Sequence, residues 1–185
     1  MFGYGLLGLI VVIAAYLAYA YNALVSTKNL AAEGWSGIDV QLRRRADLIP
    51  NLIETVKGYA SHEDKLFRDI ADLRAKSISG GTVGEQSAVG QAMSGALGKL
   101  FAVAEAYPEL KADANFRDLQ DKLSGVEDEI QMSRRYYNGA VRNLNTMIES
   151  FPSNFIANFF KFQKAEFFEI GDAAAREVPK VYFKT

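Results

Sequence analysis

The side chains best suited to chemistry in this chain are one histidine and a few glutamates. His62 and Glu63 are adjacent, and Glu105, Glu127 and Glu129 lie in later segments that a helical fold can bring opposite them. Imidazole and carboxylate groups bind metal ions. Di-metal sites in helical bundles, however, ordinarily take a Glu-x-x-His from each of two helices, and one histidine cannot supply both. We therefore expect no metal and no cofactor, with His62 and Glu63 in solvent or paired locally.

The remaining composition points away from catalysis and from nucleic acid. The 185 residues include no cysteine and a single histidine, and the usual nucleophilic constellations and the Gly-rich phosphate loop are absent or incomplete. The net charge of −1 gives no electrostatic reason to bind a polyanion. We expect no catalytic residues and no nucleic-acid partner.

Several charged residues occupy positions where a helix would bury apolar ones. Opposite charges at such positions meet inside a bundle, where they usually specify register and add little net stability. The alternative is that they line a groove or a contact between chains. The candidate buried charge network consists of Arg45, Glu63, Glu127 and Arg134, with Glu129 and Arg135 close to it.

The elements that must position these residues begin with an uncharged N-terminal stretch. The first charged side chain is Lys28, and residues 5–25 read GLLGLIVVIAAYLAYAYNALV. As a helix this stretch is roughly 31 Å long, enough to cross a bilayer core of about 30 Å. We predict a transmembrane helix over residues 5–25, after a short segment of residues 1–4. Its apolar side chains include Leu6, Leu7, Leu9, Ile10, Val11, Val12, Ile13 and Leu17.

A cleaved signal peptide is the alternative, because Ala18-Tyr19-Ala20 has the form of a cleavage site. Signal peptides carry a positive N-terminal region and a shorter apolar run, so the stretch favours an anchor. Lys28 and residues 43–45 (three arginines) follow the span, and no basic residue precedes it. The positive-inside rule then places the body of a single-pass protein in the cytoplasm.

Heptad-like seams follow the span. From Leu42 to Leu73, core-type positions recur at alternating steps of three and four, which predicts one long helix continuous with the membrane helix. Pro50 removes a backbone donor and crowds the carbonyl of Ala46, so we expect a kink there. The Gly-rich stretch of residues 77–90 predicts a loop.

Further helices are predicted after this loop. Residues 93–104 form an amphipathic pattern, and Pro108 stops that helix. Asp113 is a good N-cap for a helix whose seam covers residues 116–147 and which ends near Phe151.

These patterns predict an all-α fold, in which an N-terminal transmembrane helix runs into an antiparallel helical bundle with left-handed, heptad-like packing. The bundle contains two long helices, one shorter helix and a short C-terminal helix. Apolar seams must cover one another in water, and a chain of this size buries one core. We assign the bundle to residues 26–170 and a C-terminal tail to residues 171–185.

The sequence resembles the LemA family of bacterial membrane proteins. Residues 21–63, YNALVSTKNLAAEGWSGIDVQLRRRADLIPNLIETVKGYASHE, carry the resemblance, and EAYPELKADANFRDLQDKLSGVEDEI, RRYYNGAVRNLN and FPSNFIA extend it. The resemblance implies an N-terminal membrane helix followed by an antiparallel helical bundle, located at the bacterial cytoplasmic (inner) membrane. It implies no reaction, because the family has none that can be transferred.

Aromatic residues mark the candidate interaction surface. Trp35 either caps the membrane-proximal end of the core or contacts headgroups or a neighbouring chain. Residues 151–168 contain seven of the twelve phenylalanines. In one interpretation four of them pack on the bundle as a fourth helix: Phe151, Phe155, Phe159 and Phe162. In the other, three form an exposed patch that meets another subunit or the bilayer: Phe160, Phe167 and Phe168. The candidate surface as a whole is Trp35, Phe155, Phe159, Phe160, Phe167 and Phe168.

Two functions from different classes follow. The first is a non-enzymatic membrane scaffold that self-associates as a homo-oligomer and organises or remodels the lipid bilayer. The second is an accessory or sensor subunit for a membrane protein-quality-control enzyme, with that membrane protein as its partner. An enzyme in its own right is the least favoured reading.

Overall fold

The computed structural model describes residues 2–60 and 62–169, and these residues contain helices and no strands. The helices are α1 (Phe2–Lys57), α2 (Asp64–Ser79), α3 (Val83–Ala104), α4 (Pro108–Ala112), α5 (Ala114–Glu149) and α6 (Ser153–Phe159). The all-α prediction is confirmed, including the long helices α1 and α5, the shorter α3 and the short α6. The sequence patterns did not separate α2 from α1, and they missed α4.

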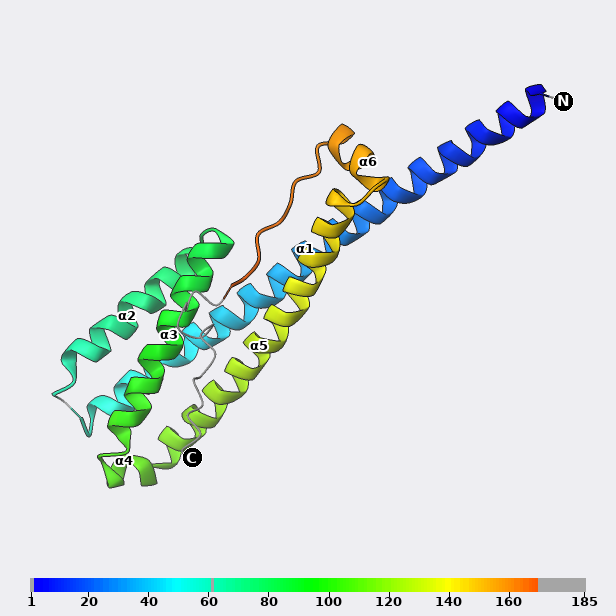
Figure 1. Ribbon diagram of the computed structural model, residues 1–185. Helices are drawn as coiled ribbons and strands as arrows, with labels where there is room; N and C mark the ends of the chain where they lie inside the picture. The colour runs from blue at the N-terminus through cyan, green and yellow to red at the C-terminus, as the bar shows by residue number, and fades with distance from the viewer. Residues whose placement is uncertain (1, 61, 170–185) are drawn as a thin grey trace, which may run out of the picture.

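Helices α1 and α5 run antiparallel along most of the molecule (Figure 1). Helices α2 and α3 form a second antiparallel pair beside the C-terminal part of α1 and the N-terminal part of α5. The N-terminal part of α1 extends well beyond the bundle (Figure 1). Helix α6 lies at the other end of α5, next to the point where α1 leaves the bundle. The half of the body next to α6 is therefore built mainly on the α1–α5 pair, and the other half on α1, α2, α3 and α5.

One long helix from Leu42 to Leu73 is a wrong prediction. The chain leaves the helix after Lys57 and turns, and α2 starts at Asp64 and packs against α1. Apolar residues before and after the turn keep helical spacing and are buried. The spacing of apolar residues alone therefore does not reveal that the helix ends at Lys57.

The predicted loop at residues 77–90 is also too long. Only residues 80–82 connect α2 to α3, and Gly80 (φ 76°) and Gly81 (φ 151°) adopt backbone conformations that favour glycine. Thr82 and Glu85 then form a capping box, because the Glu85 amide donates to the Thr82 hydroxyl (3.2 Å) and the Thr82 amide donates to the Glu85 carboxylate (2.8 Å). This cap starts the helix inside the Gly-rich stretch.

Pro50 lies inside α1, and the helix continues through it. The carbonyl of Ala46, which Pro50 cannot serve, accepts a hydrogen bond of 2.8 Å from Nε of Arg74 on α2. A side chain of a neighbouring helix thus replaces the missing backbone donor. The expected kink stays a prediction.

The predicted seam of α5 is confirmed by burial. Phe116, Leu119, Leu123, Val126 and Ile130 are all buried, as are Tyr137, Ala140 and Leu144 further along. Asp113 caps the helix as predicted, since its carboxylate accepts from the Phe116 amide at 3.0 Å. The left-handed sense of the packing stays a prediction.

Residues 162–169 form an extended segment, here called the strap, that runs back from α6 along α5 (Figure 1). Asn145 and Asn138 hold it with paired amide hydrogen bonds of 2.9–3.1 Å, each side chain both donating to and accepting from one strap residue, Ala165 and Phe168 respectively. The Tyr137 hydroxyl donates to the Glu166 carbonyl at 2.7 Å. Side chains of α5 therefore satisfy the strap's backbone as a neighbouring strand would.

Candidate membrane-interaction site

The N-terminal part of α1 is exposed along its whole length. Every residue from Gly3 to Tyr19 is exposed, and the first buried residue is Ala20. This helix is long and apolar enough to cross a membrane. The predicted span side chains are between 48% and 65% exposed: Leu6, Leu7, Leu9, Ile10, Val11, Val12, Ile13 and Leu17.

The body of the protein closes on α1 within the predicted span of residues 5–25. Ala20 and Leu24 are buried in one cluster with Ile148 of α5 and with Ile156 and Ala157 of α6. The last turn of the predicted span is therefore covered by protein, so that span and body share one packed core.

Helix α6 presents phenylalanines outward beside this boundary. Phe151, just before α6, and Phe155 and Phe159 within it recur every four residues and are 78%, 66% and 79% exposed. Phe160, directly after α6, is 52% exposed, and we call these four residues the phenylalanine ridge. Ile156 and Ala157 occupy the opposite side and are buried. The interpretation in which four phenylalanines pack on the bundle is therefore wrong for Phe151, Phe155 and Phe159, because α6 turns its smaller apolar side chains inward. Phe162, the fourth, is partly buried against the core.

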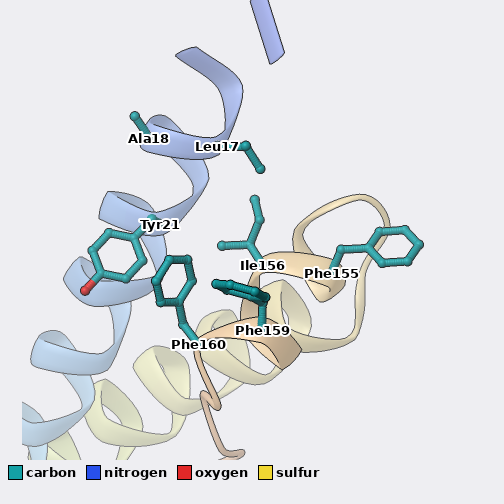
Figure 2. A pocket seen from close by; sticks show the side chains of 7 residues that line it. All are labelled: Leu17, Ala18, Tyr21, Phe155, Ile156, Phe159 and Phe160. Carbon is teal, nitrogen blue, oxygen red and sulfur yellow. The ribbon is translucent and has the colours of Figure 1, made fainter. Parts of the chain in front are cut away.

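A cleft of about 530 Å³ separates α6 from the span. Figure 2 shows Leu17, Ala18 and Tyr21 of α1 on one side and residues of α6 and its C-terminal end on the other. The walls are almost entirely carbon, since only the Tyr21 hydroxyl adds a polar side-chain group. The residues that line the cleft are Leu17, Ala18, Tyr21, Phe155, Ile156, Phe159 and Phe160.

The end of α6 is fixed by a Schellman motif with a lysine in place of the usual glycine. Lys161 has φ 56°, the Phe162 amide donates to the Ala157 carbonyl (2.8 Å), and the Lys161 amide donates to the Asn158 carbonyl (3.2 Å). Tyr21 holds this turn on α1, with its ring 4.7 Å from that of Phe160. An exposed cation thus follows the phenylalanines directly.

Three aromatic residues of the predicted surface lie on the inside instead. Phe168 is 3% exposed and packs beside Trp35, and Trp35 and Phe167 are half-buried against the same core. The Arg134 guanidinium lies 4.8 Å from the Phe168 ring centre. An exposed Phe168 is therefore a wrong prediction: the strap returns this ring to the bundle.

The predicted charge network is partly assembled. Arg45 is 2% exposed and donates to the Glu127 carboxylate (2.9 Å) and to the Ser94 hydroxyl (3.1 Å), and Ser94 in turn donates to Glu127 (3.1 Å). Burial lowers the pKa of Arg45, and the nearby carboxylate of Glu127 opposes this shift. Burial likewise lowers the pKa of Arg134, which Glu127 also opposes. Arg134 therefore lies within the electrostatic reach of the pair.

Glu63 lies outside this network. It is the N-cap residue of α2, in the turn beyond the end of α1, and this helix end is roughly 18 Å from Arg45 at 1.5 Å per residue. His62 lies in the same turn and is exposed, and Glu105 pairs with Lys111. Within the described ranges, no three His, Cys, Asp or Glu residues are grouped in a way that could hold a metal ion.

Two features of the site were not predicted from the sequence. Ser94, which joins Arg45 to Glu127, fell next to the predicted apolar seam and gave no signal. The two asparagines of α5 that bind the strap, Asn138 and Asn145, were also not predicted. They are seven residues apart and thus on one face of α5, and this spacing was the available clue.

An exposed apolar helix, an adjoining ridge of phenylalanines and an otherwise helical body define a membrane-associated helical protein. The sequence profile of the LemA family matches residues 34–183, and the chain belongs to this family. It is 26% identical to "Magnetosome protein MamQ 2" of Paramagnetospirillum magneticum, over 86% of this chain and 68% of that protein. It is 26% identical to "Magnetosome protein MamQ" of Magnetospirillum gryphiswaldense, over 82% of this chain and 65% of that protein. It is also 27% identical to "Protein LemA" of Metamycoplasma hominis, over 86% of this chain and 71% of that protein. None of these names denotes an enzyme.

Proposed function

We propose that this protein is a non-enzymatic, membrane-anchored scaffold that self-associates at the bacterial cytoplasmic membrane. One observation carries the proposal: among the described residues, the α1–α5 pair leaves large apolar side chains uncovered on the body. This bare face comprises Val40, Met132 and Tyr136, which are 57%, 47% and 49% exposed.

The bare face contains a shallow groove between α1 and α5, bordered by exposed side chains. Gly34 and Gly37 of α1 and Met132, Ser133 and Tyr136 of α5 line a shallow groove of about 410 Å³. The exposed carboxylates Glu33 and Glu129 also line this groove, so its border is acidic. A Cβ on Gly34 would approach Cα of Tyr137 to 2.9 Å, so the two helices are in close contact there. Val40 continues the α1 side one helical turn further on.

A second copy of the chain suits this face. Two copies anchored in one membrane share the same direction, so residues at equal height meet. A two-fold rotation about an axis normal to the membrane then brings Gly34 and Gly37 of α1 in each copy opposite the α5 side chains of the other copy. Each copy thus offers the same surface to its partner, as a two-fold contact requires. The relatives named as magnetosome proteins are in line with a role in assembly at a membrane.

The test is the mass of the full-length protein in mild detergent, measured by light scattering. We expect an oligomer for the natural chain and a shift to monomer for Tyr136→Glu. Ile78→Glu is the matched control, because Ile78 is similarly exposed (45%) but lies on α2. A monomeric natural chain at high concentration, or equal effects of the two substitutions, would overturn the proposal.

A further inference from the structure

We propose that the cleft between the span and α6 binds an acyl chain of a membrane phospholipid, and that the phenylalanine ridge of α6 is immersed in the membrane interface. The proposal rests on the membrane anchor of the proposed function but is independent of self-association.

The length of the exposed helix places α6 at the membrane. The exposed stretch from Gly3 to Tyr19 measures roughly 26 Å as a helix, less than a bilayer core of about 30 Å. The predicted span of residues 5–25 supplies the remaining length with the turn that follows Tyr19. That turn is the one against which Ile156 and Ala157 of α6 pack, so the cleft opens into hydrocarbon or its border.

The composition of α6 agrees with a position at the border of the hydrocarbon core. No charged residue occurs from Ser150 to Phe160, whereas Glu149 precedes this stretch and Lys161 follows it. Glu149 pairs with Lys164 of the strap. The charged groups thus border an uncharged aromatic turn, as expected for a segment whose flanks lie among headgroups and whose centre lies in the acyl region.

The exposed rings have no covering element among the described residues. Phe151 contacts Phe155, and Phe159 contacts Phe160, which also contacts Tyr21, but all four residues remain more than half exposed. Aromatic side chains bury large areas when they pack, so leaving these in water would forgo several kcal/mol at about 25 cal/mol per Å². Immersion of these side chains in the membrane interface would recover this free energy without a second protein.

The cleft suits an acyl chain in shape and in lining. Its volume of about 530 Å³ falls in the range of ligand-binding clefts, about 300–1,000 Å³. The walls offer carbon and ring faces, which bind by contact area and select no polar group. The α1 wall includes Leu17 and Ala18, which are part of the exposed surface of the span, so a lipid enters sideways from the bilayer. Lys161 is exposed next to Phe160 and supplies a cation at the level of the lipid phosphate.

A lysine at the left-handed position supports a role for this charge. Most residues lose stability at a positive φ, and glycine is the usual choice at this place in a Schellman motif. The chain instead keeps a cation where the phenylalanine turn ends.

The test of the cleft uses phosphatidylcholine that carries a nitroxide near the end of one acyl chain. Full-length protein in vesicles containing this lipid is expected to give a motionally restricted component in its electron paramagnetic resonance spectrum. Ala18→Phe fills the cleft and is expected to reduce that component. Ala14→Phe adds the same ring one turn away on the same exposed face, outside the cleft, and is expected to leave the component unchanged.

Both alanines are exposed, so neither substitution disturbs the core, and circular dichroism verifies equal helix content. Equal spectra for the two variants would overturn the acyl site. A change of oligomer mass in Ala18→Phe with an unchanged lipid signal would also overturn it, because the cleft would then hold a second copy. Loss of self-association in Tyr136→Glu with an unchanged lipid signal would support the acyl site and leave it independent of the scaffold.

The depth of α6 is tested separately with single cysteines, since the natural chain has none. A small fluorophore on Phe159→Cys is expected to be strongly quenched by lipids brominated on their acyl chains, and the same fluorophore on Ile78→Cys is expected to be unaffected. Equal weak quenching at both sites would overturn the immersion of α6.

Discussion

At the scale of single residues, two buried polar contacts specify how the helices of the body fit together. Arg45 of α1 is surrounded by Glu127 of α5, Ser94 of α3 and the carbonyl of Gly90. Arg74 of α2 binds the one carbonyl of α1 that Pro50 leaves without a backbone donor. Each contact joins different helices and is satisfied in one register only, in keeping with the use of buried polar groups for specificity.

Replacing Glu127 with Leu is expected to destabilise the protein by about 2 kcal/mol, because Arg45 would remain buried without its counter-charge. We place the loss below the roughly 3–5 kcal/mol typical of fully buried pairs, since the Glu127 side chain is 33% exposed. The double variant Arg45→Met/Glu127→Leu is expected to recover most of the loss. Denaturation in guanidinium chloride measures both, and a double variant less stable than Glu127→Leu would contradict a structural role of the pair.

Replacing Arg74 with Ala is expected to cost about 1 kcal/mol, because the Ala46 carbonyl is buried and would lose its donor. In a Pro50→Ala background the backbone amide of residue 50 serves that carbonyl, and the same substitution should cost much less. A double-mutant cycle of unfolding free energies measures the difference. Additive effects would show that Arg74 acts through other contacts.

At the scale of elements, caps and side-chain amides decide where helices start and where the strap lies. Asp113 starts α5, Thr82 and Glu85 start α3, and two asparagines of α5 bind the strap. These local hydrogen bonds set the ends that the apolar periodicity leaves open.

The cap of α5 makes stability depend on acid pH. The hydrogen bond from the Phe116 amide holds the pKa of Asp113 below its ordinary value, which is about 3.9 when unfolded. A depressed folded pKa stabilises the protein above the unfolded value and loses that contribution as pH falls through the folded value. The melting temperature should therefore fall below about pH 5, and less steeply in Asp113→Asn, which keeps an N-cap that does not titrate. Parallel acid curves for the two proteins would refute this assignment.

Replacing Asn138 and Asn145 with Asp is expected to release the strap. Aspartate keeps the shape and the acceptor but removes the donor to the carbonyls of Phe168 and Ala165. Hydrogen exchange should accelerate at the amides of these two strap residues while α2 and α3 keep their protection. Asn51→Ser, at an exposed asparagine of α1, provides a control. Unchanged exchange in the strap after replacement of Asn138 and Asn145 would count against the amide pairs.

Much of this element structure could be predicted from the sequence, and the failures have physical causes. The seam of α5 and the Asp113 cap follow from spacing and residue type, and both are confirmed. The turn after Lys57 was missed because the apolar spacing on its two sides stays in phase. Phe168 was assigned to the exposed side because its burial depends on the strap, which has no periodicity and is placed by side chains of another helix. Phe160 is exposed and Phe162 packs on the core, as expected.

At the scale of the whole molecule, one helix serves as both membrane anchor and bundle element. Leu24 is completely buried among residues of α5 and α6 although it belongs to the predicted span. The predicted span and the body therefore share one packed core. In the proposed scaffold, this shared packing would bring the bare faces of two copies to the same height.

The most direct test of the scaffold is cross-linking in native membranes with single cysteines and a short bifunctional thiol reagent. The full-length chain has no natural cysteine, so each product reports one position. Val40→Cys, on the bare face, is predicted to give cross-linked dimers, and Ile78→Cys, on α2, is predicted to give none. Monomer alone from Val40→Cys, or equal cross-linking at both positions, would contradict self-association through the α1–α5 face.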